Sequence, residues 1–180
     1  MEPTGLEQVR ALAHPLRLRL LELFKLKPRT AKQAAEVLGE PPTRLYHHVA
    51  ALERAGLIRL RETRQNRGTT EKYYEASLPM RPVGKKDLTD KNARRDLASM
   101  GLVVFNQARN ELVTTLASDQ VPANLMALRA VLTLTPAAAT RLTKQLLDVL
   151  KSAKAGKKPA RGKTRTYAVT IALVPTEESA

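Results

Sequence analysis

The chain contains no cysteine and no tryptophan, and aromatic residues make up only 3% of its 180 residues. Without cysteine it can form no disulfide, thiol nucleophile or thiolate metal site. A core must therefore consist mainly of Leu, Val and Ala, which the 43% apolar content supports. No apolar run approaches the roughly 20 residues of a membrane span. The N-terminal MEPTGLEQVR lacks the apolar run of a signal peptide, so we expect a cytoplasmic protein with no membrane partner.

Signs of catalysis are also missing. The sequence has no Gly-rich phosphate loop, and its Ser and His residues form no recognisable catalytic arrangement. After Asp119, the only carboxylates are Asp148, Glu177 and Glu178. We therefore expect no enzyme, no catalytic residues and no cofactor.

Positive charge is abundant. The 31 basic and 17 acidic residues give a formal charge of +14 and a pI near 10.4. Such an excess favours a polyanionic partner, with nucleic acid first and an acidic membrane surface second. The alternative is a soluble protein that is merely basic.

The N-terminal part has the pattern of a helix-turn-helix. Residues 6–26 follow a helical apolar period, and Pro15 opens a turn with His14 before it in a cap-like position. Thr30 can cap a second helix over residues 31–38, which Gly39 ends. A third helix is expected from Thr43 to residue 55, followed by Gly56. Two short helices joined by about four residues fit a helix-turn-helix.

A hairpin is expected directly after the third helix. In IRLRETRQNRGTTEKYYEAS, Ile58 and Leu60 alternate with Arg59 and Arg61, the period of a half-buried strand. QNRG supplies turn residues, and a returning strand contains two Tyr residues. A hairpin in this position is the wing of a winged helix.

The rest of the chain predicts a connector, a long helix and a small terminal unit. The connector is ASLPMRPVGKK, and the long helix covers residues 88–117. Its wide apolar arc predicts packing against a second copy, although packing on its own chain alone is the other possibility. The expected dimer residues are Leu97, Met100, Val104, Phe105, Leu112 and Leu116.

The last third of the chain reads as strand, helix, strand. LMALRAVLTL is a strand-like run, Pro136 starts a helix, and apolar residues alternate from Tyr167 to residue 174. We therefore predict an α+β, mostly helical fold in three parts. These are a winged helix-turn-helix DNA-binding domain (1–78), a linker with the long dimerisation helix (79–120), and a small βαβ-like unit with a basic loop (121–180).

The stretch PPTRLYHHVAALERAGLI raises the question of whether its two adjacent His bind a metal. On a helical wheel Leu45, Val49 and Leu52 face inward, whereas His47 and His48 diverge by about 100° and cannot share one ion. No Cys, Asp or Glu completes a metal shell nearby, so we expect no metal site. Thr43, Tyr46, His47, Ala50 and Arg54 lie outward, with Arg44 on one flank.

The outward face suits the major groove of DNA, where Arg pairs with guanine and Thr or Tyr reaches bases or phosphates. Basic residues of the hairpin would extend the footprint along phosphates or into the minor groove. A solvated basic surface is the alternative. The expected DNA contacts are Thr43, Arg44, Tyr46, His47 and Arg54 on the helix, and Arg61, Arg64, Arg67 and Lys72 in the hairpin.

These segments resemble a known family. ALAHPLRLRLLELF, RLYHHVAALERAGLI and EKYYEAS, over about residues 6–78, are similar to ArsR-type winged-helix transcriptional regulators. The resemblance implies a cytoplasmic homodimer that binds an operator, most often as a repressor, with Thr43, Arg44, Tyr46 and His47 on the recognition helix. Family members that sense metals use Cys or His sites. With no Cys and no His beyond residue 48, metal sensing is not implied, and an effector ligand stays unknown.

The basic loop KSAKAGKKPARGKTR contains seven basic and no acidic residues. It is either a second DNA-contacting arm without sequence preference or a self-repelling solvated loop. The residues concerned are chiefly Lys157, Lys158, Arg161 and Lys163.

Three functions remain open on the sequence alone. The first is a dimeric, sequence-specific transcriptional regulator that binds double-stranded DNA. The second is an architectural protein that coats DNA with little sequence preference. The third is a winged helix that binds a protein partner.

Overall fold

The computed structural model describes residues 2–66, 68–77, 81–84, 86–155 and 166–176. The chain divides into two compact units, Met1–Leu112 and Val113–Ala180, each of which is described by itself.

Four short helices begin the first unit: α1 (Gly5–Leu12), α2 (Pro15–Leu26), α3 (Ala31–Leu38) and α4 (Pro42–Arg54). The predicted segment 6–26 is divided at His14, whose Nδ1 accepts a hydrogen bond from the Leu16 amide at 3.2 Å. Thr30 caps α3, as the sequence predicts, because its Oγ1 accepts from the Gln33 amide and the Gln33 side chain accepts from the Thr30 amide. Gly39 follows α3 in the left-handed conformation, with φ +68°, which other residues adopt only at a cost. Local capping chemistry thus sets where these helices start and stop.

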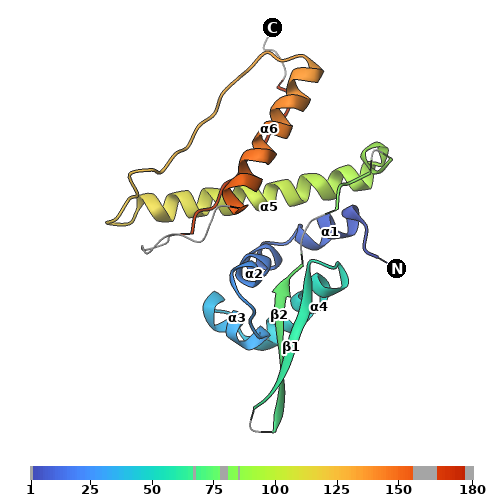
Figure 1. The fold of residues 1–180 in the computed structure, drawn as a ribbon, viewed down its shortest axis with the longest axis vertical. Helices are drawn as coiled ribbons and strands as arrows, with labels where there is room; N and C mark the ends of the chain where they lie inside the picture. The colour runs from blue at the N-terminus through green and yellow to red at the C-terminus, as the bar shows by residue number, and fades with distance from the viewer. Residues whose placement is uncertain (1, 67, 78–80, 85, 156–165, 177–180) are drawn as a thin grey trace. The chain divides into compact units, whose positions relative to one another are not determined.

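The predicted hairpin is present as strands β1 (Ile58–Asn66) and β2 (Thr69–Ala76), paired antiparallel. It projects away from the helices (Figure 1). Ile58 is buried, but Leu60 is 43% exposed, so the expected half-buried alternation ends after the first residue of the strand. Two backbone hydrogen bonds, of 2.8 and 3.0 Å, join Tyr74 of β2 to Arg29 in the segment between α2 and α3.

The core of the first unit is aliphatic, as the composition predicts. The Phe24 and Tyr74 rings, with centroids 6.2 Å apart, are its aromatic pair. Each fully buried aliphatic side chain contributes about 1.5–3 kcal/mol relative to exposure. The largest fully buried side chains of the described residues are Phe24, Leu20, Leu21, Leu45, Leu52, Leu57 and Ile58.

A single turn of 3-10 helix, η1 (Asp87–Thr89), precedes the long helix α5 (Lys91–Leu116), close to the predicted range of 88–117. One side of α5 packs against the N-terminal helices. Ala93 is completely buried, Met100 packs against the N-terminal core, and Arg10 donates to Asp96 of α5 at 2.6 Å. Met100 therefore packs within its own chain.

The second unit contains α6 (Pro136–Ala155), which confirms the predicted helix. The prediction of a strand on each side of this helix is wrong, because the described residues 117–135 and 166–176 include no strand. A strand needs a neighbour for its backbone hydrogen bonds, and no backbone hydrogen bond joins these two described segments to each other. None of the described residues of this unit is buried. No helix in the described ranges is long and apolar enough to cross a membrane.

Candidate nucleic-acid interface

Helix α4 has one face in the core and one in solvent. Leu45 and Leu52 are completely buried and Val49 nearly so, which fixes the rotation of the helix about its axis. The predicted contact residues lie on the other side, where all are exposed: Thr43, Arg44, Tyr46, His47 and Arg54. The division between the two faces is the one that the helical wheel predicts.

The ends of α4 come from backbone chemistry rather than from a side-chain cap. Pro42 occupies the first helical position, and no side chain caps the N-terminus. Proline suits this position because an N–H group there would have no hydrogen-bond partner within the helix. At the other end, Gly56 has φ +63° and its amide donates to the Glu53 carbonyl at 2.9 Å. The N-terminal turn of α4 therefore exposes Thr43 and Arg44, while the buried leucines hold the helix in place.

The two adjacent His residues belong to a cluster of three imidazoles. The centroid of the His48 ring is 4.5 Å from that of His14 and 3.8 Å from that of His47. The prediction that His47 and His48 diverge is wrong for the rings, because a helical wheel places only the Cβ atoms and side-chain rotation brings the rings together. Even so, no group of three His, Asp or Glu among the described residues could hold a metal ion.

Burial lowers the pKa of His48 and of His14. Desolvation, followed by the charges of His47, His14, Arg17 and Arg44, lowers the pKa of His48 to about 4. Desolvation also lowers the pKa of His14, with smaller contributions from Arg17, Arg44 and His47. The Nδ1 atom of His48 is buried and makes no hydrogen bond to any described group. At neutral pH His48 is therefore an uncharged packing residue behind the outward face.

Arg44 does not stand free on the face of α4. Its Nη1 donates to Glu40 Oε2 at 2.8 Å, an i, i+4 pair with an exposed arginine. Exposed ion pairs contribute about 0–1 kcal/mol, so a nucleic acid can displace Glu40 at little cost.

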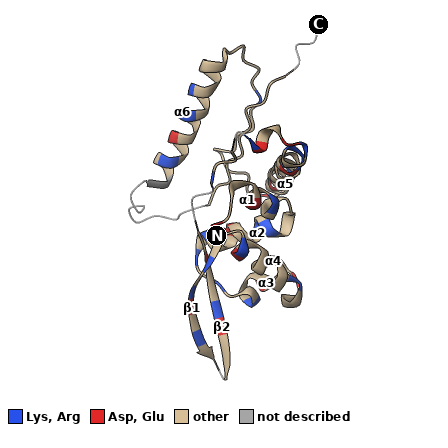
Figure 2. Ribbon diagram, turned by 90° about the vertical axis from the view of Figure 1, so that its right-hand side faces the viewer, with Lys and Arg blue, Asp and Glu red and all other residues tan. Residues whose placement is uncertain are grey.

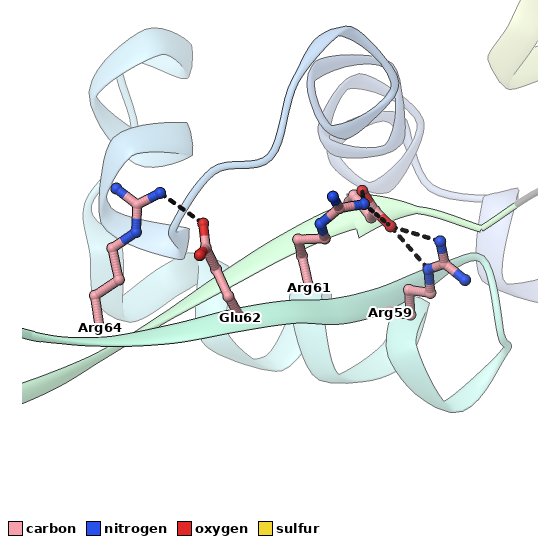
Figure 3. Close-up of polar contacts among 5 residues, drawn as sticks. Arg59, Arg61, Glu62 and Arg64 are labelled. Carbon is pink, nitrogen blue, oxygen red and sulfur yellow. Dashed lines mark hydrogen bonds and ion pairs between the residues drawn. The ribbon is translucent and has the colours of Figure 1, made fainter.

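The hairpin carries basic residues on both strands (Figure 2), yet all three of its described arginines are paired with carboxylates. Glu75 accepts from Arg59 at 2.7 and 2.9 Å and from Arg61 at 3.1 Å. Arg64 donates to Glu62 at 2.6 Å and lies 4.6 Å above the centroid of the Tyr73 ring. The hydrogen bonds between these arginines and glutamates are drawn in Figure 3.

The sequence gives the number of glutamates in this region, but it does not predict which arginines they bind. A plain hairpin register continued from the Asn66–Thr69 pair would place Arg59 opposite Ala76, so the pairing of Arg59 with Glu75 depends on a register shift. The register shift between Leu60 and Glu62 could not be foreseen, because an inserted residue leaves no composition signal.

Two predicted hairpin residues remain, Lys72 and Arg67. Lys72 is exposed, and no hydrogen bond or ion pair joins its side chain to a described residue. Arg67 lies outside the described residues, as do Lys157, Lys158, Arg161 and Lys163 of the basic loop.

The predicted dimer residues of α5 fall on two sides. Leu97, Met100, Val104 and Leu112 are half-buried, whereas Phe105 and Leu116 are 47% and 55% exposed. At about 100° per residue, Leu102, Phe105, Val113 and Leu116 lie within an arc of about 80°, roughly opposite Ala93 and Met100. The exposed stripe therefore differs in part from the one predicted, which included residues that pack on their own chain.

Comparison with known proteins agrees with this geometry. Residues 12–61 match the family model of a helix-turn-helix domain. The match runs from the end of α1 through α4 into β1, well under half of the chain. No curated protein matches the sequence. The first unit therefore carries a helix-turn-helix DNA-binding domain of the winged-helix type, with β1 and β2 as its wing-like hairpin.

Proposed function

We propose that the protein is a sequence-specific transcriptional regulator of the ArsR type that binds double-stranded DNA as a homodimer, most simply as a repressor. Helix α4 enters the major groove, and the hairpin lies on the flanking backbone or minor groove. The observation that carries this proposal is the outward face of α4. Thr43, Arg44, Tyr46 and His47 are all exposed there, on a helix anchored by buried leucines.

Base readout is favoured because these side chains supply directional donors and acceptors. An arginine can bond guanine O6 and N7 together, and Thr, Tyr and His can reach base edges or phosphates. Arg54, further along α4, is exposed and suits a phosphate. An architectural protein would need only charge, and this set offers more than charge.

The homodimer is supported by the exposed stripe of α5, namely Leu102, Phe105, Val113 and Leu116. Large apolar side chains that recur along one side of a helix favour a helix–helix interface. A symmetric dimer would present two copies of α4 to half-sites about one helical turn of DNA apart. Lys157, Lys158, Arg161 and Lys163 would add contacts without sequence preference.

The test is selection of bound sites from a random duplex pool by the full chain, at two salt concentrations. The proposal expects an enriched motif with two-fold symmetry that persists at the higher salt. Enrichment without any motif would favour an architectural protein, and no retention of duplex at all would favour a protein-binding module.

A further inference from the structure

The outer face of the hairpin combines arginines with glutamates in a specific order. Arg59 is directly opposite Glu75, and Glu62 is opposite Tyr73. Because the register shift inserts Arg61 between these pairs, Glu62 and Arg64 share a face with Arg59 and Glu75 rather than alternating to the other side. The other face at the base of the hairpin is directed to the core through Tyr74, which is 8% exposed.

Glu75 is the centre of this arrangement. One carboxylate accepts hydrogen bonds from two guanidinium groups, those of Arg59 and Arg61 (Figure 3). The Glu75 side chain is 16% exposed, whereas the two arginine side chains are 66% and 57% exposed. Bonding to Arg59, and then to Arg61, keeps the pKa of Glu75 below its ordinary value. The carboxylate is therefore ionised and held, while the guanidinium groups remain accessible from solvent.

A carboxylate and a phosphate compete for the same guanidinium donors, because both accept bidentate hydrogen bonds from arginine. An arginine already neutralised by an internal carboxylate adds less net charge to a DNA footprint than a free one. It should also release fewer condensed counter-ions when it meets a phosphate.

We propose that Glu75 is an internal counter-ion of the wing, a positioning residue that holds Arg59 and Arg61 and that DNA phosphate must displace or share. Glu75 then lowers affinity for every duplex alike and leaves sequence preference to α4. This inference rests on the proposed function, since it concerns the strength of the same DNA binding.

The test compares E75Q with E36Q in the full chain. Glu36, on α3, is exposed and pairs with no described residue in a salt bridge, so E36Q removes the same charge without releasing an arginine. Affinity for a selected site and for a random duplex is measured at about 50 and about 200 mM salt. For each further phosphate that E75Q neutralises, its affinity should fall about 3.5-fold more than that of E36Q between these two conditions. At the lower salt concentration E75Q should bind both duplexes more tightly than E36Q does.

Further variants separate charge from structure. E75D keeps the charge and should retain the wild-type salt dependence. Arg61→Ala should weaken the salt dependence less than Lys72→Ala, because Arg61 is bound to Glu75 and the Lys72 side chain has no described partner. This second comparison also holds if E75Q folds poorly.

The two proposals fail in different ways. A wild-type chain that ignores duplex DNA overturns the proposed function and this inference with it. Wild-type binding to DNA with equal salt dependence in E75Q and E36Q overturns the inference alone. A change in sequence preference in E75Q would also contradict it.

Discussion

Arg44 is the residue through which base readout is most easily measured. In Arg44→Ala we expect a loss of about 1–3 kcal/mol of binding free energy on the preferred site and a smaller loss on random duplex, because only the preferred site offers guanine in register. The fold should be unaffected, since the pair with Glu40 is exposed. Competition binding with both duplexes measures this.

Arg54→Ala is the control for Arg44→Ala. Arg54 is exposed on α4 and is expected to contact phosphate, so its removal should weaken binding to both duplexes by the same factor. Equal losses on both duplexes in Arg44→Ala would show that Arg44 reads no base.

His48 predicts how stability depends on pH. Its pKa is about 4 in the fold against 6.5 for a free imidazole, so the unfolded chain binds the proton more tightly. Stability from His48 is therefore full above about pH 6.5 and declines as the pH falls toward 4. The free energy of unfolding should drop by about 2 kcal/mol between about pH 7 and about pH 5 from this group, as measured by urea unfolding.

His48→Phe is the matched variant, because it keeps a flat ring beside His14 and His47 and removes the titrating group. Between about pH 7 and about pH 5, its free energy of unfolding should lack the drop of about 2 kcal/mol expected from His48. A smaller pH dependence should remain from His14, whose pKa is also lowered. Identical pH profiles for the two proteins would mean that His48 is not held neutral in the fold.

At the scale of elements, α1 approaches the connector too closely for any side chain at Gly5. A Cβ there would clash with the Pro82 carbonyl oxygen and would lie 2.8 Å from that of Arg81. Because these are backbone atoms, Gly5→Ala must displace the connector or α1, and we expect a loss of about 1–3 kcal/mol. Thermal and urea unfolding measure the change.

Gly101 of α5 is the control for Gly5. A Cβ at Gly101 meets nothing within 4 Å, and alanine is favoured over glycine inside a helix by about 1 kcal/mol. Gly101→Ala should therefore stabilise the protein. If Gly5→Ala is as harmless as Gly101→Ala, the connector does not pack on α1 as described.

The elements also show what a sequence can predict. The starts and ends of α2, α3 and α4 depend on neighbours in sequence, such as His14, Thr30 and Gly56, and these were foreseen. The register shift at Arg61 depends on how two strands meet, and Met100 depends on which side of α5 finds the core. Such tertiary features override local pattern. The apolar alternation in residues 167–174 predicted a strand that the described chain does not form.

At the scale of the whole molecule, the α5 stripe predicts the assembly state. Leu102 and Phe105 are 66% and 47% exposed, and glutamate at both positions would bury two charges in a helix–helix interface. Leu102→Glu with Phe105→Glu should give folded monomers where the wild type is a dimer. Light scattering measures the mass, and circular dichroism checks the fold.

Asn110→Glu with Thr114→Glu adds the same charge to α5 away from the stripe and should leave the dimer intact. A wild-type-like mass for the Leu102 and Phe105 variant would place the interface elsewhere. A monomeric wild type would remove the homodimer from the proposal.

The most direct measurement for the whole account is the ratio of affinities for a selected duplex and a scrambled one, at matched salt. If the exposed face of α4 reads bases, the full chain should prefer its selected site by about a thousandfold or more, and Arg44→Ala should reduce that ratio. A ratio near one, unchanged in Arg44→Ala, would contradict the account even if the protein binds DNA tightly.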